Sequence, residues 1–197
     1  MEINIPTSLK DIKMHQFIAF EKSDKTDDDY IIHLCEFANP KLLPKKEYAE
    51  IVALLKEVMQ SDVEFHKIFK HEGISFGFIP DLDKITANEF MHIEEYIKQP
   101  DTWHKALAVL YRPLTKRKRN WFKRGADDLY DVLPYQEENA FEKLMLDVSC
   151  VYYLGSMVFF YNLGNDLLKY MQDYSKVLEN KIKKKHTLTK SGDGMLA

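Results

Sequence analysis

The stretch GISFGFIPDLDKITANEFMHIEEYIKQPDTWHKALAVLYRP, residues Gly73–Pro113, has the clearest secondary-structure pattern in the sequence. At its start Ile74, Phe76 and Phe78 alternate with smaller residues, which is typical of a half-buried strand. Glu72-Gly73 lies just before this run and suits a tight turn, because glycine adopts backbone angles that other residues avoid. The pattern therefore predicts a β-hairpin near residues 64–79.

Two helices are predicted in the rest of this stretch. Thr86 and Glu89 have the spacing of a capping box, in which each side chain binds the other's backbone amide. In the helix that follows, the spacing predicts inward positions for Phe90, Ile93 and Ile97. Pro100-Asp101 restarts the chain, and Pro113 is expected to end the second helix.

Outside this stretch the apolar spacing is mostly helical. A helix over about 45–60 has one apolar face, and a long helix is expected from Ser149 to about Asn180. Residues 115–135 lack such a stripe, which predicts an exposed loop. The expected fold class is mainly α: a compact bundle of six to seven helices with one small β-hairpin. The expected organisation is a single helical domain over 1–180 and a basic, disordered tail over 181–197.

Composition narrows the class of protein. The chain has 197 residues, is 45% hydrophobic and has a formal net charge of −3. This charge does not fit a dedicated DNA-binding protein, so nucleic acid is not expected as a partner. No signal peptide is predicted at the N-terminus. Val148–Leu163 is too short and too polar for a membrane span, so no membrane contact is expected.

No residue pattern predicts catalysis. Cys35 and Cys150 are far apart and belong to no CxxC pair, which leaves them as buried thiols. His92-Ile93-Glu94-Glu95 does not place ligands on one helix face as a metal site requires. The sequence has no glycine-rich phosphate loop and no nucleophile elbow. We therefore expect a protein that is not an enzyme, with no catalytic residues, no metal and no cofactor.

One basic segment leaves two interpretations open. Residues 116–124 read KRKRNWFKR, in which basic side chains surround a Trp-Phe pair. This composition is typical of a patch for nucleic acid or an acidic partner. A solvated loop with an aromatic plug is the favoured interpretation. If the segment binds a partner, Arg117, Arg119, Trp121 and Arg124 are the residues expected to do so.

Three further segments carry a resemblance to a known group of proteins. FGFIPDLDKITANEFMHIEEYI, AVLYRP and GSMVFFYNLGNDLL follow one another in an order and at a spacing similar to small helical proteins of phage tail gene modules. These proteins belong to tailed bacteriophages of Bacteroidetes-type hosts and act as tail assembly chaperones or related tail-module proteins. The resemblance covers roughly residues 60–170. The basic loop and the basic tail are not part of it.

The resemblance implies a function in the host cell cytoplasm. Such a chaperone binds the apolar, helical tape measure protein, or another tail protein, until tail tube subunits assemble around it. Phe17, Phe20, Tyr48 and Phe160 are the expected contact residues, although each also suits the core. Self-association is left open, as is a longer form made by frameshifting near Lys183-Lys184-Lys185. The alternative is a structural or packaged virion protein whose basic loop contacts DNA or an acidic subunit.

Overall fold

The computed structural model describes residues 3–118, 129–136, 140–166, 169 and 171. The chain divides into two compact units, Met1–Ser156 and Met157–Ala197. The expected boundary between residues 180 and 181 lies outside the described residues.

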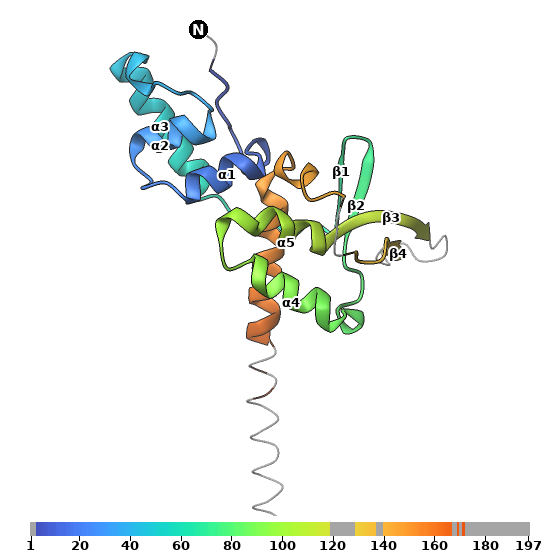
Figure 1. Cartoon of the computed structure of the whole chain (residues 1–197). Helices are drawn as coiled ribbons and strands as arrows, with labels where there is room; N and C mark the ends of the chain where they lie inside the picture. Colours follow the sequence, from blue (N-terminus) through green and yellow to red (C-terminus); the bar gives the residue numbers. More distant parts are fainter. Residues whose placement is uncertain (1–2, 119–128, 137–139, 167–168, 170, 172–197) are drawn as a thin grey trace, which may run out of the picture. The chain divides into compact units, whose positions relative to one another are not determined.

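A four-stranded antiparallel sheet organises the first unit (Figure 1). Its strands are β1 (Ile68–His71), β2 (Ile74–Phe78), β3 (Tyr111–Lys118) and β4 (Leu129–Val132), and they lie side by side in that order. The hairpin expected near Glu72-Gly73 is present, with Phe69 opposite Phe76. Glu72 and Gly73 both have positive φ angles, of 46° and 82°, as a two-residue hairpin turn requires.

Aromatic rings form the core beside the sheet. Phe69 stacks on Phe76 and on Tyr152, with ring centroids 5.2 and 4.2 Å apart. The buried Tyr111 contacts Phe69 and donates its hydroxyl proton to the carbonyl of His66, at 2.6 Å. A buried tyrosine needs such an acceptor, and this one joins β3 to the segment that precedes β1.

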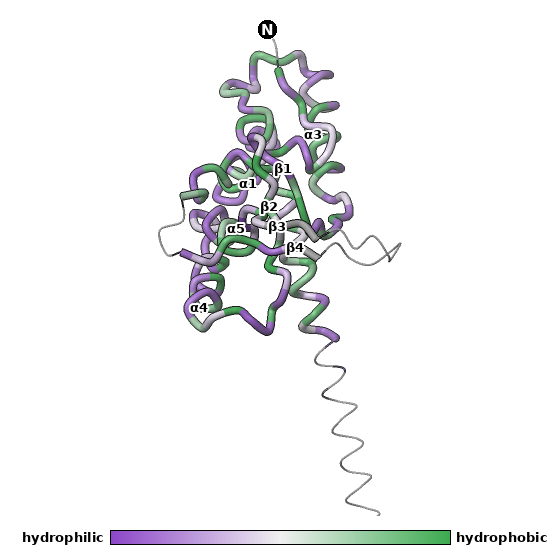
Figure 2. The backbone as a smooth tube through the Cα atoms, turned by 90° about the vertical axis from the view of Figure 1, so that its right-hand side faces the viewer, coloured by the Kyte–Doolittle hydropathy of each residue, from purple (hydrophilic) through white to green (hydrophobic). Residues whose placement is uncertain are grey.

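Helices precede the sheet in the chain. A 3₁₀ turn (Leu9–Asp11) leads into α1 (Met14–Glu21), and a short α2 (Asp27–Asp29) continues as a π-helical turn (Tyr30–Leu34). After a 3₁₀ turn (Pro40–Leu42) comes α3 (Lys45–Met59), whose buried residues are Ile51, Val52, Leu55 and Val58. Figure 2 shows hydrophobic and hydrophilic residues alternating along α3, as expected of a helix with one buried face.

Two more helices lie between β2 and β3. A 3₁₀ turn (Leu82–Lys84) comes first, and α4 (Ala87–Tyr96) then begins with the predicted capping box. The Thr86 hydroxyl accepts from the Glu89 amide at 3.2 Å, and Glu89 Oε2 accepts from the Thr86 amide at 2.7 Å. A 3₁₀ turn (Pro100–Thr102) leads into α5 (Trp103–Leu110). This helix ends directly before β3, three residues before the predicted stop at Pro113.

The first turns of another helix complete the first unit. After a 3₁₀ turn (Leu144–Leu146), Ser149 bridges Lys13, and residues 150–166 are helical, as are 169 and 171. Cys150, Val151, Tyr153 and Ser156 are buried, and Tyr153 stacks on Trp103 at 5.1 Å. The expectation that Val148–Leu163 forms a core helix therefore fits its first half, whereas Leu163 is exposed.

The predicted fold class is wrong, because the structure is a mixed α/β fold and not a helical bundle with one hairpin. The error lies in residues 111–132, where β3 and β4 replace the end of a helix and the expected loop. Pro113 pairs opposite Phe76 inside β3, a position where proline usually argues against a strand. Strand β3 pairs with β2, and β4 pairs with β3. Each of the two strands also contributes a buried tyrosine, Tyr111 and Tyr130, which no alternation of apolar residues predicts.

Candidate functional site

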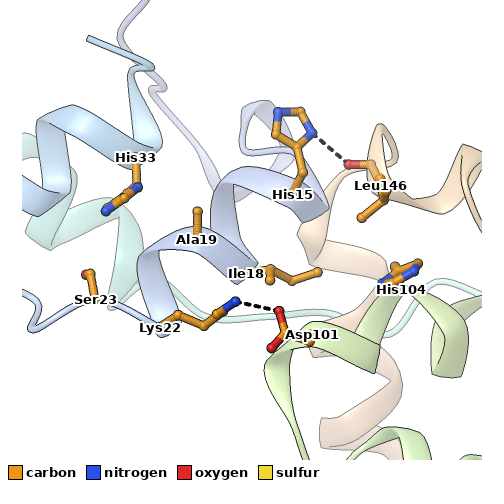
Figure 3. A pocket seen from close by; sticks show the side chains of 9 residues that line it. All are labelled: His15, Ile18, Ala19, Lys22, Ser23, His33, Asp101, His104 and Leu146. Atoms are coloured by element: carbon orange, nitrogen blue, oxygen red, sulfur yellow. Dashed lines mark hydrogen bonds and ion pairs between the residues drawn. The ribbon is translucent and has the colours of Figure 1, made fainter. Parts of the chain in front are cut away.

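A hollow of about 480 Å³ lies along one side of α1 (Figure 3). Three of its lining residues are histidines from three different elements. The residues that line it are His15, Ile18, Ala19, Lys22, Ser23, His33, Asp101, His104 and Leu146. A smaller hollow of about 240 Å³ adjoins it and shares His15, Ala19 and His33.

The position of these side chains follows from helix geometry. His15, Ala19 and Lys22 are four and three residues apart, so they lie along one face of α1. The π-helical turn that follows α2 brings His33 to the same face, and His104 comes from the first turn of α5. Residues about 90 positions apart in the sequence therefore meet in one hollow.

His15 joins three segments of the chain. Its Nδ1 lies 2.9 Å from the carbonyl oxygen of Leu146, and its Nε2 lies 2.9 Å from Oε1 of Glu36. Both partners are hydrogen-bond acceptors, so the two bonds form together only when both ring nitrogens carry a proton. Glu36 reaches this position from a left-handed backbone conformation, with φ of 53°, just after the π-helical turn.

An ion pair lies at the rim of the hollow. Lys22 Nζ lies 2.6 Å from Oδ1 of Asp101, which connects α1 to the 3₁₀ turn before α5 (Figure 3). Both side chains are about half exposed or more, so the pair adds little stability but places opposite charges at the rim.

The three histidines differ in their surroundings. Burial lowers the pKa of His104, and neighbouring Lys105 lowers it further, while Glu142 and Asp101 oppose the shift. His33 Nε2 lies 3.8 Å from Oδ1 of Asp29. Its side chain lies on the opposite side of the hollow from His104 (Figure 3). His104 is therefore a neutral imidazole at neutral pH, able to accept or donate one hydrogen bond.

This lowered pKa predicts a pH dependence of stability. In the unfolded chain His104 titrates near its ordinary pKa of about 6.5, so just below this pH the unfolded state binds more protons than the folded state. The free energy of unfolding should therefore fall as the pH decreases from 7 to about 5.5. His104→Gln should reduce that slope in urea denaturation. Asp81→Asn is the control, because its lowered pKa acts below about pH 4, and an unchanged slope in His104→Gln would contradict the prediction.

Two chemical roles of the hollow, metal binding and nucleophile activation, can be compared with its geometry. In the part of the chain that the structure describes, no group of three or more His, Cys, Asp or Glu residues is placed to hold a metal ion. The Ser23 hydroxyl donates to the carbonyl of Phe20 at 2.7 Å, so it closes the end of α1 and is not activated by a base.

Three of the four predicted contact residues lie in the first unit, and Phe160 lies in the second. Phe17 and Phe20 are buried; Phe17 stacks on Trp103 at 5.6 Å, and Phe20 meets the ring of Tyr30 at 4.6 Å. Tyr48 is half-buried and donates its hydroxyl proton to Asp28 at 2.8 Å. Phe160 is half-buried beside Phe159 in the second unit. These side chains do not form one surface within the first unit.

The predicted basic patch is only partly described. Arg117 lies in β3 and pairs with Tyr130 of β4. Arg119, Trp121 and Arg124 lie outside the described residues.

A second candidate surface lies on the outer side of α4. Phe90 and Met91 are 60% and 58% exposed, and Ile97, just after the helix, is 38% exposed. The inward positions predicted for Phe90 and Ile97 are therefore wrong, and Ile93 alone of the three is buried. The cause is Glu89, whose carboxylate points inward to Arg112 at 2.8 Å and so turns the side of the helix that bears Phe90 outward.

Comparisons with known proteins give no assignment for either surface. No family model matches this chain, and neither does any curated protein or solved structure. Among the described helices, none is both long and apolar enough to cross a membrane.

Proposed function

We propose that this protein is a non-enzymatic assembly factor of a tailed bacteriophage, which binds an apolar helical segment of the tape measure protein in the host cytoplasm. The observation that carries the proposal is the outward apolar face of α4, formed by Phe90, Met91 and Ile97. The order of sequence segments similar to phage tail-module proteins gives the proposal its biological setting.

The α4 face has the properties that recognition of a helix needs. Ile97 lies seven residues after Phe90, so both lie on one side, and Met91 widens the stripe. An amphipathic client helix can lay its apolar face along such a stripe. Methionine adapts to irregular partners because its side chain is unbranched and polarisable. Glu94 and Lys98 form an ion pair at 3.7 Å on the same side and keep the surface soluble.

The mechanism is holding, and it makes or breaks no bond. A client whose apolar stripe is buried against α4 cannot use that stripe to associate with other client molecules. The fraction of client that is bound rises with the concentration of free chaperone. A stripe of three side chains gives limited affinity after the entropic cost of association. Such reversible binding suits a factor that must release the client when tube subunits arrive.

A substitution test separates this surface from general surface hydrophobicity. The chain is co-expressed with the long coding frame expected directly downstream of its gene, and the soluble fraction of that product is measured. Phe90→Ser is expected to weaken retention of the client about tenfold, because one buried aromatic ring contributes roughly 1.5–3 kcal/mol. Leu42→Ser is the matched control, because Leu42 is also 60% exposed but belongs to the 3₁₀ turn before α3. This variant should keep the client as soluble as the wild-type chain does.

Two results would contradict the proposed function. The first is equal loss of client solubility in Phe90→Ser and Leu42→Ser. The second is detection of this protein by mass spectrometry as a stoichiometric component of purified virions, since a chaperone leaves before the particle is complete. That second result would favour the alternative of a structural or packaged virion protein.

A further inference from the structure

A small pocket in the first unit is lined by Arg112, which also forms a buried ion pair with Glu89. The pocket has a volume of about 70 Å³, and its walls are mostly apolar, among them Pro113, Leu133 and Phe141. A cavity needs roughly 10–15 Å³ of such space to hold one water molecule. The pocket therefore has room for a group of several heavy atoms.

The ion pair leaves one donor of Arg112 without an acceptor. Nη1 of Arg112 lies 2.8 Å from Oε1 of Glu89, and Arg112 is only 9% exposed. Within the part of the chain that the structure describes, the buried Nε of Arg112 has no hydrogen-bond partner. A buried N–H without an acceptor is costly, because it has lost its bonds to water. A ligand that brings an acceptor to Nε therefore supplies the hydrogen bond that the fold lacks.

The carboxylate of Glu89 is not free to serve this donor as well. Its Oε2 accepts from the amide of Thr86 at 2.7 Å and from the hydroxyl of Thr86 at 2.8 Å. Turning the carboxylate toward Nε would break the capping box at the start of α4. The backbone of Arg112 is held opposite Gly77 in the sheet. The ion pair and the sheet thus fix the guanidinium from both ends.

The walls of the pocket are held by the fold. The amide of Leu133 donates to the carbonyl of Pro113 at 2.9 Å, which joins two of the walls. The ring of Phe141 meets the ring of Phe76 edge to face, with centroids 5.7 Å apart. Leu133 is 39% exposed, and the neighbouring Pro134, which also lines the pocket, is exposed. The pocket is therefore preformed and has an apolar rim, as small-ligand sites usually have.

The charges of the ion pair indicate which acceptor fits. Arg112 and Glu89 neutralise each other, so a carboxylate bound at Nε would leave a buried group with a net negative charge. The uncharged carbonyl oxygen of an amide accepts from an N–H without that cost. The exposed Gln136 also lines the pocket, and its side-chain amide can both donate to and accept from a second amide.

We propose that this pocket binds an uncharged amide group, whose carbonyl oxygen accepts a hydrogen bond from Nε–H of Arg112. A free small amide and the side chain of an asparagine in a partner chain both carry this chemistry. The inference goes beyond the proposed function and does not rest on it, because it uses the inward carboxylate of α4 and not the outward apolar face.

The Nε–H signal of Arg112 in the nuclear magnetic resonance spectrum of the full ¹⁵N-labelled chain tests the proposal directly. Acetamide and acetate have nearly the same shape and differ in charge, so each is titrated to about 200 mM. Ala140→Trp places a large ring at the edge of the pocket, because the exposed Ala140 is one of its lining residues. Ala53→Trp is the matched control, because Ala53 is also exposed but lies in α3.

Acetamide should shift the Arg112 signal with a dissociation constant on the order of 10 mM, because so small a ligand has a limited binding free energy. Acetate should bind at least about tenfold more weakly, because it brings a second negative charge. Ala140→Trp should lose the response to acetamide, and Ala53→Trp should keep it. The proposal is overturned if acetamide gives no saturable shift, if acetate binds as tightly, or if Ala140→Trp responds like the wild-type chain.

The capped peptide acetyl-Leu-Asn-Leu-amide distinguishes the two sources of the amide. Its leucines can cover the apolar rim formed by Leu133 and Pro134 while the asparagine side chain enters the pocket. Binding about tenfold tighter than that of acetamide assigns the pocket to a partner chain, since the added apolar contacts contribute affinity. Equal or weaker binding of the peptide assigns the pocket to a free small amide.

Discussion

Replacing Arg112 with methionine is expected to lower the free energy of unfolding by about 3–5 kcal/mol, because it leaves a buried carboxylate without its partner. Arg112 is 9% exposed and Glu89 is 4% exposed, and Nη1 of Arg112 lies 2.8 Å from Oε1 of Glu89. Burial lowers the pKa of Arg112 and Glu89 opposes that shift, which reflects how far the pair is removed from water. Urea denaturation measures the loss.

The double variant Glu89→Gln with Arg112→Met distinguishes a lost partner from lost packing. Glutamine keeps an acceptor for the amide of Thr86 while removing the buried charge, so the double variant should recover much of the stability. Lys84→Met is the surface control: Lys84 pairs with Asp81 at 2.7 Å, but the pair is exposed and should contribute less than about 1 kcal/mol. A loss as small in Arg112→Met as in Lys84→Met would show that the buried pair contributes no more than an exposed one.

This pair also shows what local sequence patterns reveal and what they omit. The spacing of Thr86 and Glu89 predicts the start of α4 correctly, because a capping box is formed within one turn of chain. The same pattern does not reveal Arg112, which approaches from β3, more than twenty residues later. Because that contact turns Glu89 inward, the side of α4 that Phe90 occupies could not be predicted from apolar spacing alone.

One part of the sheet could be predicted from local sequence patterns and the other part could not. The β1–β2 hairpin is visible in the sequence because its turn residues and its alternating rings are adjacent. Strand β3 pairs with β2, more than thirty residues earlier in the chain, and its Lys, Arg and Thr residues resemble those of a solvated loop. Tertiary context therefore overrides local propensity in this region.

The hollow along α1 could not be found from the sequence for the same reason. His15, His33 and His104 stand at unrelated spacings, and only the packing of three elements brings them together. The local sequence indicates only that His15, Ala19 and Lys22 share one face of a helix.

Gly155 offers the clearest case in which packing should reverse a local preference. It lies in the helix of residues 150–166, where alanine normally stabilises by about 0.5–1 kcal/mol relative to glycine. A Cβ atom at this position would lie 2.6 Å from the backbone carbonyl oxygen of Glu64 and 3.2 Å from Cα of Phe65. Both atoms belong to the backbone, so the contact cannot be relieved by rotating a side chain.

Gly155→Ala is therefore expected to lower the free energy of unfolding by about 1–3 kcal/mol, the usual cost of overpacking. Gly164→Ala in the same helix is the matched control, because a Cβ there has no atom within 4 Å, and it should stabilise by up to about 1 kcal/mol. Thermal and urea denaturation of the two variants should thus give opposite signs. Stabilisation by both would mean that the segment around Glu64 moves away at little cost, and that the approach of this helix to the strand region is not tightly fixed.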